Sequence, residues 1–253
     1  MTVPATPDRV TWPYPRWIAH RGAGRLAPEN TLAAFRLGAE HGYRMFECDA
    51  KLSRDGVPFL MHDASLERTT SGHGIGGDHP WHDLAVLDAG SWHSRRFAGE
   101  PLASLSNAAR FCRANDCMLN IEIKPTPGLE RITGDVVAQH AARWWADAPV
   151  PPLLSSFKVE ALEAARAAAP ALPRALLLDD LPPDWLERSL GLGCLAVVCN
   201  HALWDAGTVG RARAAGLRTL SYTVNDAWAA ERLIALGTDG IITDRVDLFS
   251  PAR

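Results

Sequence analysis

Apolar and polar positions alternate between two patterns along most of the chain. Short apolar runs are followed by longer amphipathic runs rich in Ala and Leu. The short runs predict eight strands, at residues 17–20, 45–50, 118–124, 153–156, 174–178, 195–200, 218–224 and 240–243. The longer runs predict helices at residues 31–41, 104–115, 129–145, 159–169, 184–190, 206–215 and 227–236. Strands that alternate with helices favour a parallel sheet, and eight of them predict a (β/α)8 TIM barrel.

Capping residues support two of these helices, and one segment breaks the regular pattern. Asn30 is expected to cap the first helical run. Either Asn225 or Asp226 caps the last run, and Gly237 ends it. Only about ten residues follow the eighth strand, so a helix there would have to be very short. Residues 64–103 are rich in Gly, His, Trp and Asp, and we interpret them as a small insertion after the second strand, over the barrel mouth.

Length, composition and charge fit one globular domain over residues 1–253. A barrel of this type needs roughly 250 residues, and 47% of the residues here are apolar. The formal net charge is −3 and no basic face stands out, which argues against nucleic acid as a partner. The sequence carries no signal for an oligomeric state.

Two features indicate the cell compartment. The five cysteines are odd in number and lack the spacing of a zinc site or a redox pair, which indicates buried thiols in a reducing environment. The N-terminal segment lacks a secretory signal, and no apolar run reaches the ~20 residues of a membrane span. We therefore expect a cytoplasmic protein without a membrane span.

Polar residues collect where the first two predicted strands end. Catalytic groups of such barrels lie at the C-terminal ends of the strands. The first strand ends in AHRG, which places His20 and Arg21 at this rim. The second strand carries Glu47 and Asp49, which are two positions apart and therefore share a face.

The third strand adds another acidic position. It ends in LNIEIKP, so that Asn120, Glu122 and Lys124 share one face. The carboxylates of Glu47, Asp49 and Glu122 would repel one another unless a cation lay among them. A hard divalent ion with oxygen ligands, Mg²⁺ or Ca²⁺, meets this condition, whereas zinc more often takes imidazole ligands.

A predicted hairpin brings a second histidine to the same place. The segment ECDAKLSRDGVPFLMHD alternates around Asp55-Gly56, a dipeptide favoured in two-residue hairpin turns. With such a turn, opposed residues have numbers that sum to 111. Asp49 then faces His62 on the same side of the hairpin.

These residue types suit the cleavage of a phosphodiester. His20 and His62 would serve as general acid and base beside a metal-bound phosphate. The metal ion would polarise a phosphoryl oxygen, and Arg21 and Lys124 would donate to the other oxygens. Taken singly, the histidines also suit a structural role and the two cations suit ion pairs with the acids. Their occurrence together at strand ends favours a catalytic site.

Several segments resemble the glycerophosphodiester phosphodiesterase family, in the expected order. They are AHRGAGRLAPENTLAAF, ECDAKLSRDGVPFLMHDASLERTTSGHG, DAGSW, FAGEPLASL, LNIEIKP, LSSF, YTVND and GTDGIITD. The first two are highly specific, whereas LSSF and YTVND alone would be weak signals. The resemblance runs from residue 17 to residue 247 and implies a barrel with a small insertion after its second strand. It also implies hydrolysis of small glycerophosphodiesters, such as glycerophosphocholine or glycerophosphoethanolamine, to an alcohol and sn-glycerol 3-phosphate.

The resemblance assigns roles to individual residues. The family's paired histidines map onto His20 and His62. Its metal-binding acids map onto Glu47, Asp49 and Glu122, and its phosphate contacts map onto Arg21 and Lys124. In the PENT segment, Glu29 and Asn30 are expected to order the loop after the first strand, with Glu29 near the site. Tyr222 stands where the family often has Trp, and we expect it to form an apolar wall beside the glycerol.

Two other functions fit parts of the pattern. A related barrel phospholipase would act on intact lipid, in the manner of phosphatidylinositol-specific phospholipases or sphingomyelinase D. The chain has neither a secretion signal nor an apolar or basic helix suited to membrane docking, which argues against it. A non-catalytic barrel that only binds a ligand would not need the complete set of histidines, acids and lysine.

Overall fold

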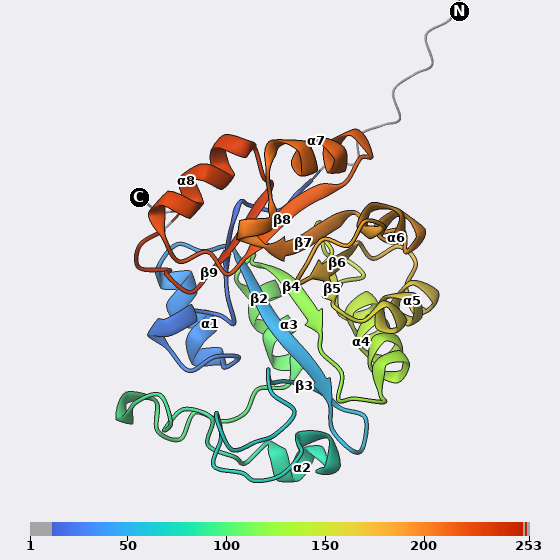
Figure 1. The fold of residues 1–253 in the computed structure, drawn as a ribbon. Coiled ribbons are helices and arrows are strands. Elements are labelled where there is room, and N and C mark those ends of the chain that lie inside the picture. The colour runs from blue at the N-terminus through green and yellow to red at the C-terminus, as the bar shows by residue number, and fades with distance from the viewer. Residues whose placement is uncertain (1–11, 250, 252–253) are drawn as a thin grey trace, which may run out of the picture.

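Eight parallel strands form a closed barrel in the computed structural model, which describes residues 12–249 and 251 (Figure 1). The barrel strands are β1 (Trp17–Ala19), β2 (Met45–Leu52), β4 (Met118–Ile123), β5 (Leu153–Ser156), β6 (Arg174–Leu178), β7 (Ala196–Asn200), β8 (Arg218–Tyr222) and β9 (Gly240–Thr243). Each strand pairs with the next in this order, and β1 pairs with both β2 and β9, which closes the ring. The predicted (β/α)8 barrel is confirmed.

Seven helices surround the barrel in the described part of the chain (Figure 1). They are α1 (Leu32–Glu40), α3 (Leu105–Ala114), α4 (Glu130–Trp144), α5 (Val159–Ala168), α6 (Trp185–Gly191), α7 (Ala206–Ala214) and α8 (Ala227–Leu236). Each begins and ends within one residue of its predicted range. No helix follows β9 within the residues that the structure describes.

One predicted helix cap is wrong, and a second is right in position but makes no capping hydrogen bond. The side chain of Thr31, not that of Asn30, accepts the capping hydrogen bond from the Ala34 N–H of α1. Asp226 occupies the cap position of α8, but its side chain makes no capping hydrogen bond. Gly237 ends α8 in the left-handed conformation, as predicted.

The interior of the barrel is apolar at one end and polar at the other. Side chains alternate along a strand, so Met45, Glu47 and Asp49 of β2 all point inward. Met45 belongs to an apolar cluster formed mainly by strand residues, which are Ile18, Leu153, Ala175, Leu177, Ala196, Val198, Leu220 and Ile242, with Tyr14. Glu47 and Asp49 lie nearer the C-terminal end of β2, above this layer. The apolar layer therefore closes the floor beneath the polar residues.

The hairpin after β2 forms with a different register from the predicted one. β3 (Pro58–Leu60) pairs antiparallel with β2, and opposed residues have numbers that sum to 110. The Ser53 N–H donates to the Val57 carbonyl, which leaves three residues in the turn. Gly56 adopts the left-handed conformation that this turn needs, with φ at 79°. The predicted two-residue turn is therefore wrong by one residue.

The predicted pairing of Asp49 with His62 is wrong for the same reason. The Met61 N–H donates to the Asp49 carbonyl at 2.9 Å, so Met61 takes the opposed position. His62 follows β3 on a segment that has left the ladder, and it lines the same pocket as Glu47. His62 therefore lies near the acids as predicted, although it does not pair with Asp49 in the hairpin.

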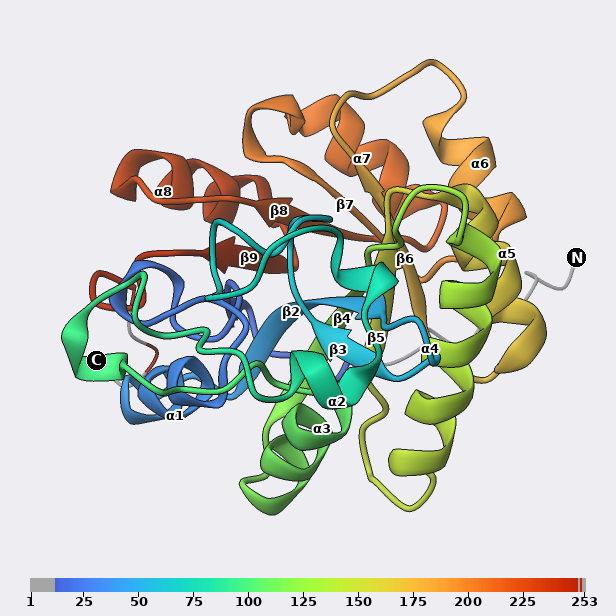
Figure 2. The same cartoon turned by 90° about the horizontal axis from the view of Figure 1, so that it is seen from below.

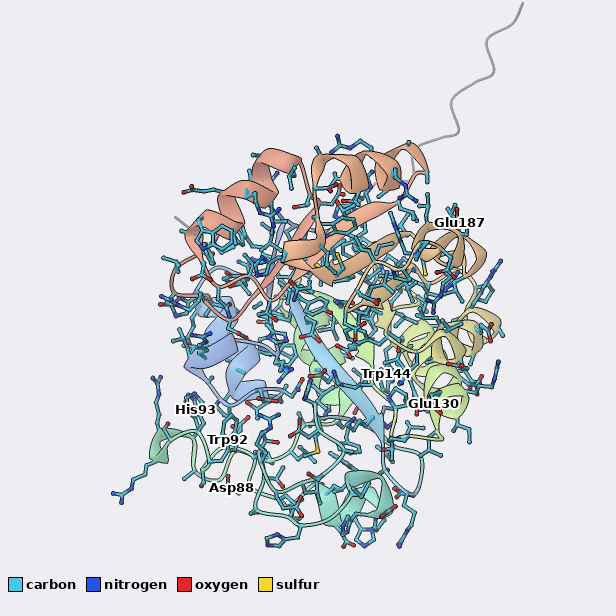
Figure 3. All side chains as sticks on the ribbon, viewed as in Figure 1. Asp88, Trp92, His93, Glu130, Trp144 and Glu187 are labelled. Carbon is cyan, nitrogen blue, oxygen red and sulfur yellow. The ribbon has the colours of Figure 1, made fainter. Side chains whose placement is uncertain are left out.

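Residues 61–104 connect β3 to α3 and contain the short elements η2 (Gly76–Asp78), α2 (Trp81–Leu84) and η3 (Arg95–Phe97). Viewed from below, this segment crosses in front of β2 and β3 (Figure 2). It has an apolar cluster of its own, formed by Phe59, Met61, Leu66, Leu84, Ala89 and Leu102. His93, labelled in Figure 3, places Nε2 3.1 Å from the carbonyl oxygen of Arg25. The insertion therefore rests against the loop that follows β1.

The cysteines match the prediction of buried thiols. All five cysteines are free and buried. Among the described residues, no helix has both the length and the apolar character that a membrane crossing requires.

Candidate active site

Three buried carboxylates meet at the C-terminal end of the barrel interior. Asp49 of β2 lies opposite Glu122 of β4 in the parallel register, and Glu47 precedes Asp49 by two positions on the same face. Their exposed fractions are 3% for Glu47, 1% for Asp49 and 9% for Glu122. One oxygen from each residue lies within 4.8 Å of the oxygens of the other two. The structure thus brings together the three acids that the sequence singled out.

Protein groups alone do not satisfy this acidic cluster. Glu47 Oε1 and Asp49 Oδ1 are buried and accept no hydrogen bond from the described residues. Burial and the charge of Asp49 raise the pKa of Glu47 to about 8, and the same two causes raise the pKa of Glu122. A cation among these oxygens would offset the repulsion and give a ligand contact to the two oxygens that accept no hydrogen bond. Carboxylate oxygens are the ligands that Mg²⁺ and Ca²⁺ prefer, so the residues present fit such an ion.

Asn30 fixes Asp49 from two sides. Its side-chain amide donates to Asp49 Oδ2 at 2.8 Å, and its amide oxygen accepts from the Asp49 N–H at 3.1 Å. Asn30 has φ at 60° and Arg21 has φ at 50°, an uncommon conformation for residues other than glycine. Such strained residues cluster at functional sites, where the surrounding contacts hold them in place. The loop after β1 is therefore shaped to bring both side chains to Asp49.

Two cations flank the acids. The Arg21 guanidinium donates to Glu29 Oε1 at 2.9 Å, and its Nε lies 3.3 Å from Asp49 Oδ2. The Lys124 ammonium donates to Glu122 Oε1 at 2.8 Å and lies 3.4 Å from Asp49 Oδ1. Burial by itself would raise the pKa of Asp49, but Arg21 and Lys124 together lower it below its usual range. Asp49 is therefore ionised at neutral pH.

His20 pairs with a carboxylate from the other end of the chain. Its Nδ1 lies 2.6 Å from Asp244 Oδ1, although the two residues are 224 positions apart. The contact arises because β1 pairs with β9, so that the chain after each strand emerges side by side. The Asn225 amide donates to Asp244 Oδ2 at 2.9 Å and holds it in place. Burial lowers the pKa of His20, but the hydrogen bond with Asp244 and the charge of Glu47 raise it overall.

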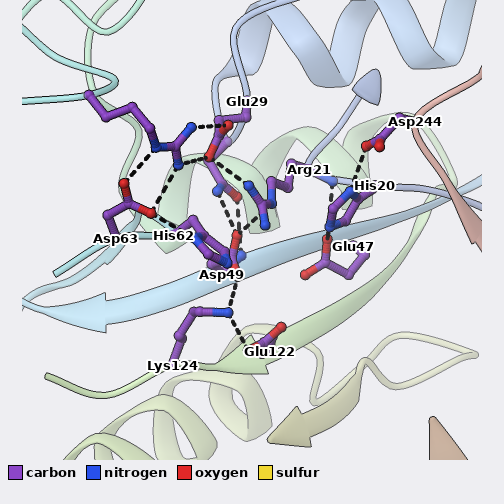
Figure 4. A network of polar contacts seen from close by, with 12 residues as sticks. His20, Arg21, Glu29, Glu47, Asp49, His62, Asp63, Glu122, Lys124 and Asp244 are labelled. Atoms are coloured by element: carbon purple, nitrogen blue, oxygen red, sulfur yellow. Dashed lines mark hydrogen bonds and ion pairs between the residues drawn. The ribbon is translucent and has the colours of Figure 1, made fainter. Parts of the chain in front are cut away.

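His62 has an equivalent partner on the other side of the acids. Its Nδ1 lies 2.7 Å from Asp63 Oδ1. Figure 4 shows His62 beside Asp49 and His20 beside Glu47, so the two imidazoles flank the acidic cluster. Burial lowers the pKa of His62.

A cavity of about 300 Å³ joins these groups. The sequence-predicted residues that line it are His20, Arg21, Glu47, His62, Glu122, Lys124 and Tyr222. Its apolar side consists of Phe157, Leu177, Tyr222 and Ile242. The Tyr222 hydroxyl donates to the Leu178 carbonyl at 2.8 Å, and its ring meets that of Phe157 edge to face. Tyr222 therefore presents an aromatic ring to the cavity.

The sequence did not single out several residues that shape the site. These are Asp63 and Asp244, which bind the two histidines, Arg68, which binds Asp63, and Phe157, which lines the cavity. Asp244 directly follows the last strand of a closed ring, a position next to the end of β1. This position could have identified it.

Comparison with known proteins gives the family. The sequence profile of the glycerophosphoryl diester phosphodiesterase family matches residues 20–248. The chain belongs to this family. The resemblance found in the sequence is confirmed, and the protein is a phosphodiesterase.

Relatives of this phosphodiesterase match it over nearly its whole length. The glycerophosphodiester phosphodiesterase of Caldanaerobacter subterraneus subsp. tengcongensis is 31% identical, over 90% of this chain and 93% of the relative. A phosphodiesterase of Oleispira antarctica, solved in complex with the product sn-glycerol-3-phosphate, is 35% identical with a TM-score of 0.85, over 91% of this chain and 93% of that one. A glycerophosphodiester phosphodiesterase of Agrobacterium tumefaciens str. C58 is 28% identical with a TM-score of 0.77, over 94% of this chain and 99% of that one.

Proposed function

We propose that this phosphodiesterase hydrolyses small glycerophosphodiesters to an alcohol and sn-glycerol 3-phosphate, with one divalent cation and two histidines. The observation that carries the proposal is the position of three buried carboxylates between two imidazoles. One oxygen of Glu47 and one of Asp49 accept no hydrogen bond from the described residues, and each imidazole is bound to a separate aspartate. The product in the Oleispira antarctica complex supports the choice of substrate.

Glu47, Asp49 and Glu122 would hold the cation. When bound, a Mg²⁺ or Ca²⁺ ion supplies Lewis acidity to a phosphoryl oxygen and offsets charge that develops at phosphorus. Arg21 and Lys124 line the same cavity and would donate to the remaining phosphate oxygens. Tyr222 and Phe157 would pack against the carbon skeleton of the glycerol.

The two histidines divide the proton transfers. His62, whose pKa is lowered, is neutral and accepts the proton of the attacking oxygen. His20, whose pKa is raised, holds a proton more readily than His62 and acts as the acid that donates it to the departing alcohol oxygen. Each ring contacts a carboxylate through Nδ1, which leaves Nε2 for the transfer. The P–O bond to the alcohol breaks as the new P–O bond forms.

A metal-supplemented assay tests this proposal. Glycerophosphocholine and glycerophosphoethanolamine are offered with Mg²⁺ or Ca²⁺, and release of glycerol 3-phosphate is measured. His20→Ala and His62→Ala should each lower turnover at least ~100-fold, the scale of positioned acid–base groups. His140→Ala, on the outer helix α4, is the matched control and should retain full turnover. Turnover near wild type in either active-site variant would remove that histidine from the mechanism.

The cytoplasmic location stays a prediction from the sequence, as does the assignment of the whole chain to one domain.

A further inference from the structure

Arg68, on the insertion, binds two acids at once. Its Nε and Nη2 contact the two oxygens of Asp63, the latter at 3.0 Å. Its Nη1 and Nη2 donate to the two oxygens of Glu29 at 2.9 and 2.8 Å. Both pairs have the bidentate geometry in which a guanidinium binds a carboxylate most strongly. One side chain thus connects the loop after β1 to the segment after β3.

Each of these acids contacts a residue of the proposed mechanism. Asp63 binds Nδ1 of His62, the proposed base. Glu29 accepts a hydrogen bond from Arg21, which lines the cavity beside the acids. Arg68 is therefore one contact away from a proton-transfer group and from a phosphate-binding group.

The contacts continue through the site as a chain of alternating charge. In order, its members are Asp63, Arg68, Glu29, Arg21, Asp49, Lys124 and Glu122. Figure 4 shows the part that runs from Glu29 through Arg21 and Asp49 to Lys124 and Glu122. Every interior member lies between two groups of opposite sign, so removing one takes a compensating charge away from both of its neighbours.

Arg68 is not placed to bind the substrate directly. A guanidinium has five N–H donors, and the bonds to Asp63 and Glu29 use four of them. Arg68 does not line the cavity. The backbone around it is anchored, because Leu66 is buried in the apolar cluster of the insertion and the Thr70 N–H donates to the Leu66 carbonyl at 3.0 Å.

We propose that Arg68 is a positioning residue that sets the orientation of His62 and Arg21 together, and so makes catalysis depend on the docked insertion. This inference rests on the proposed function, because it assumes that His62 transfers a proton and that Arg21 binds phosphate. A displacement of about 1 Å at a reacting group can lower the rate ~100-fold.

The first test compares Arg68→Ala, Arg68→Lys and a matched control. Arg131→Ala removes another exposed arginine–carboxylate pair, the one that joins α4 to Glu163 of α5, and should keep wild-type kinetics. Arg68→Ala should lower kcat/KM roughly 10- to 100-fold, mostly through kcat, because orientation is lost. Arg68→Lys keeps the charge but cannot bridge two carboxylates as a fork, so it should recover only a small part of the loss. Wild-type kinetics in Arg68→Ala would overturn the proposal.

A double-mutant cycle separates positioning from general stabilisation. In a Glu29→Gln/Asp63→Asn background, both acids that Arg68 holds are neutral. Adding Arg68→Ala there should change kcat/KM by less than ~3-fold, because the contacts through which it acts are already weakened. A loss as large as that in the wild-type background would overturn the proposal. If Arg68→Ala unfolds at the assay temperature, Arg68→Lys is used in the same cycle.

The outcome for His62→Ala distinguishes the two proposals. An inactive His62→Ala together with a fully active Arg68→Ala contradicts the positioning role alone. A fully active His62→Ala contradicts the proposed function itself.

Discussion

His20 and His62 have opposite pKa shifts although both rings contact a carboxylate through Nδ1. Partial burial lowers the pKa of His20, but Asp244 and Glu47 together raise it above its usual value. Burial lowers the pKa of His62, and the charge of Arg21 lowers it further. The charge of Asp49 raises the pKa but does not outweigh these two effects. The two rings can therefore hold different protonation states at the same pH, which acid–base catalysis requires.

The pH profile of kcat/KM tests this assignment. Activity should rise as His62 loses its proton and fall at higher pH as His20 loses its own, which gives a bell shape. Asp244→Asn removes a contact that raises the pKa of His20, so the alkaline limb should move to lower pH. Asp63→Asn removes a contact that raises the pKa of His62, so the acid limb should move to lower pH. A shift of the acid limb alone in Asp244→Asn would reverse the assignment.

The sequence predicted the residues that point into the cavity better than it predicted their partners. Glu47 and Asp49 follow from the alternation of side chains on a strand that ends at the rim. Asp244 binds His20 only because the ring closes between β1 and β9. Asp63 adjoins His62 in sequence, but spacing alone does not say that its oxygen would turn back to the ring. A residue that holds another side chain in place leaves a weaker sequence pattern than a residue whose own side chain points into the barrel.

At the scale of elements, loops after strands decide whether the site is assembled. The loop after β1 carries His20, Arg21, Glu29 and Asn30, and it must pass close to the chain after β9. The hairpin shows how one turn residue changes a register, since a three-residue turn replaced the expected two-residue turn. An Asp-Gly dipeptide fits either turn, with glycine in the left-handed position, so sequence favoured a hairpin without fixing its register.

A substitution at Gly24 tests the close approach between the loop after β1 and the chain after β9. Its φ is 54°, and a methyl group there would overlap the backbone of Asp244. Gly24→Ala should therefore displace Asp244 from His20 and lower kcat/KM roughly 10- to 100-fold. Gly216→Ala is the control, since Gly216 has φ at 80° but no atom within 4 Å of the added carbon. The control should cost about 1 kcal/mol of unfolding free energy through backbone strain without changing kinetics. Equal kinetics in the two variants would contradict the role of this contact.

At the scale of the whole molecule, closure of the barrel gathers residues from distant parts of the chain. Strand and helix runs alternate regularly enough in the sequence to predict this architecture. The insertion has no such period, and its short elements, η2, α2 and η3, depend on contacts with Phe59 and other residues of its own cluster. Its docking through Arg68 could therefore not be predicted from local pattern.

The size of the cavity favours water-soluble substrates. A space of about 300 Å³ suits a glycerophosphodiester and lies at the low end for small-molecule sites. We expect glycerophosphocholine and glycerophosphoethanolamine to be cleaved much faster than micellar phosphatidylcholine at equal concentrations. The rate is measured as the phosphate ester released from each substrate. Faster cleavage of the micellar lipid would favour a phospholipase that acts on intact lipid.

The proposed function depends on a divalent cation bound by the acidic cluster. Calorimetric titration of chelator-treated protein with Mg²⁺ or Ca²⁺ tests this claim most directly. We predict one bound ion per chain, with affinity at least ~10-fold weaker in Glu122→Gln, since even indirect metal-site contacts are worth that much. Glu187→Gln, an exposed glutamate on α6 (Figure 3), should bind as wild type does. Equal affinity in Glu122→Gln and wild type, or full activity in excess chelator, would contradict the account.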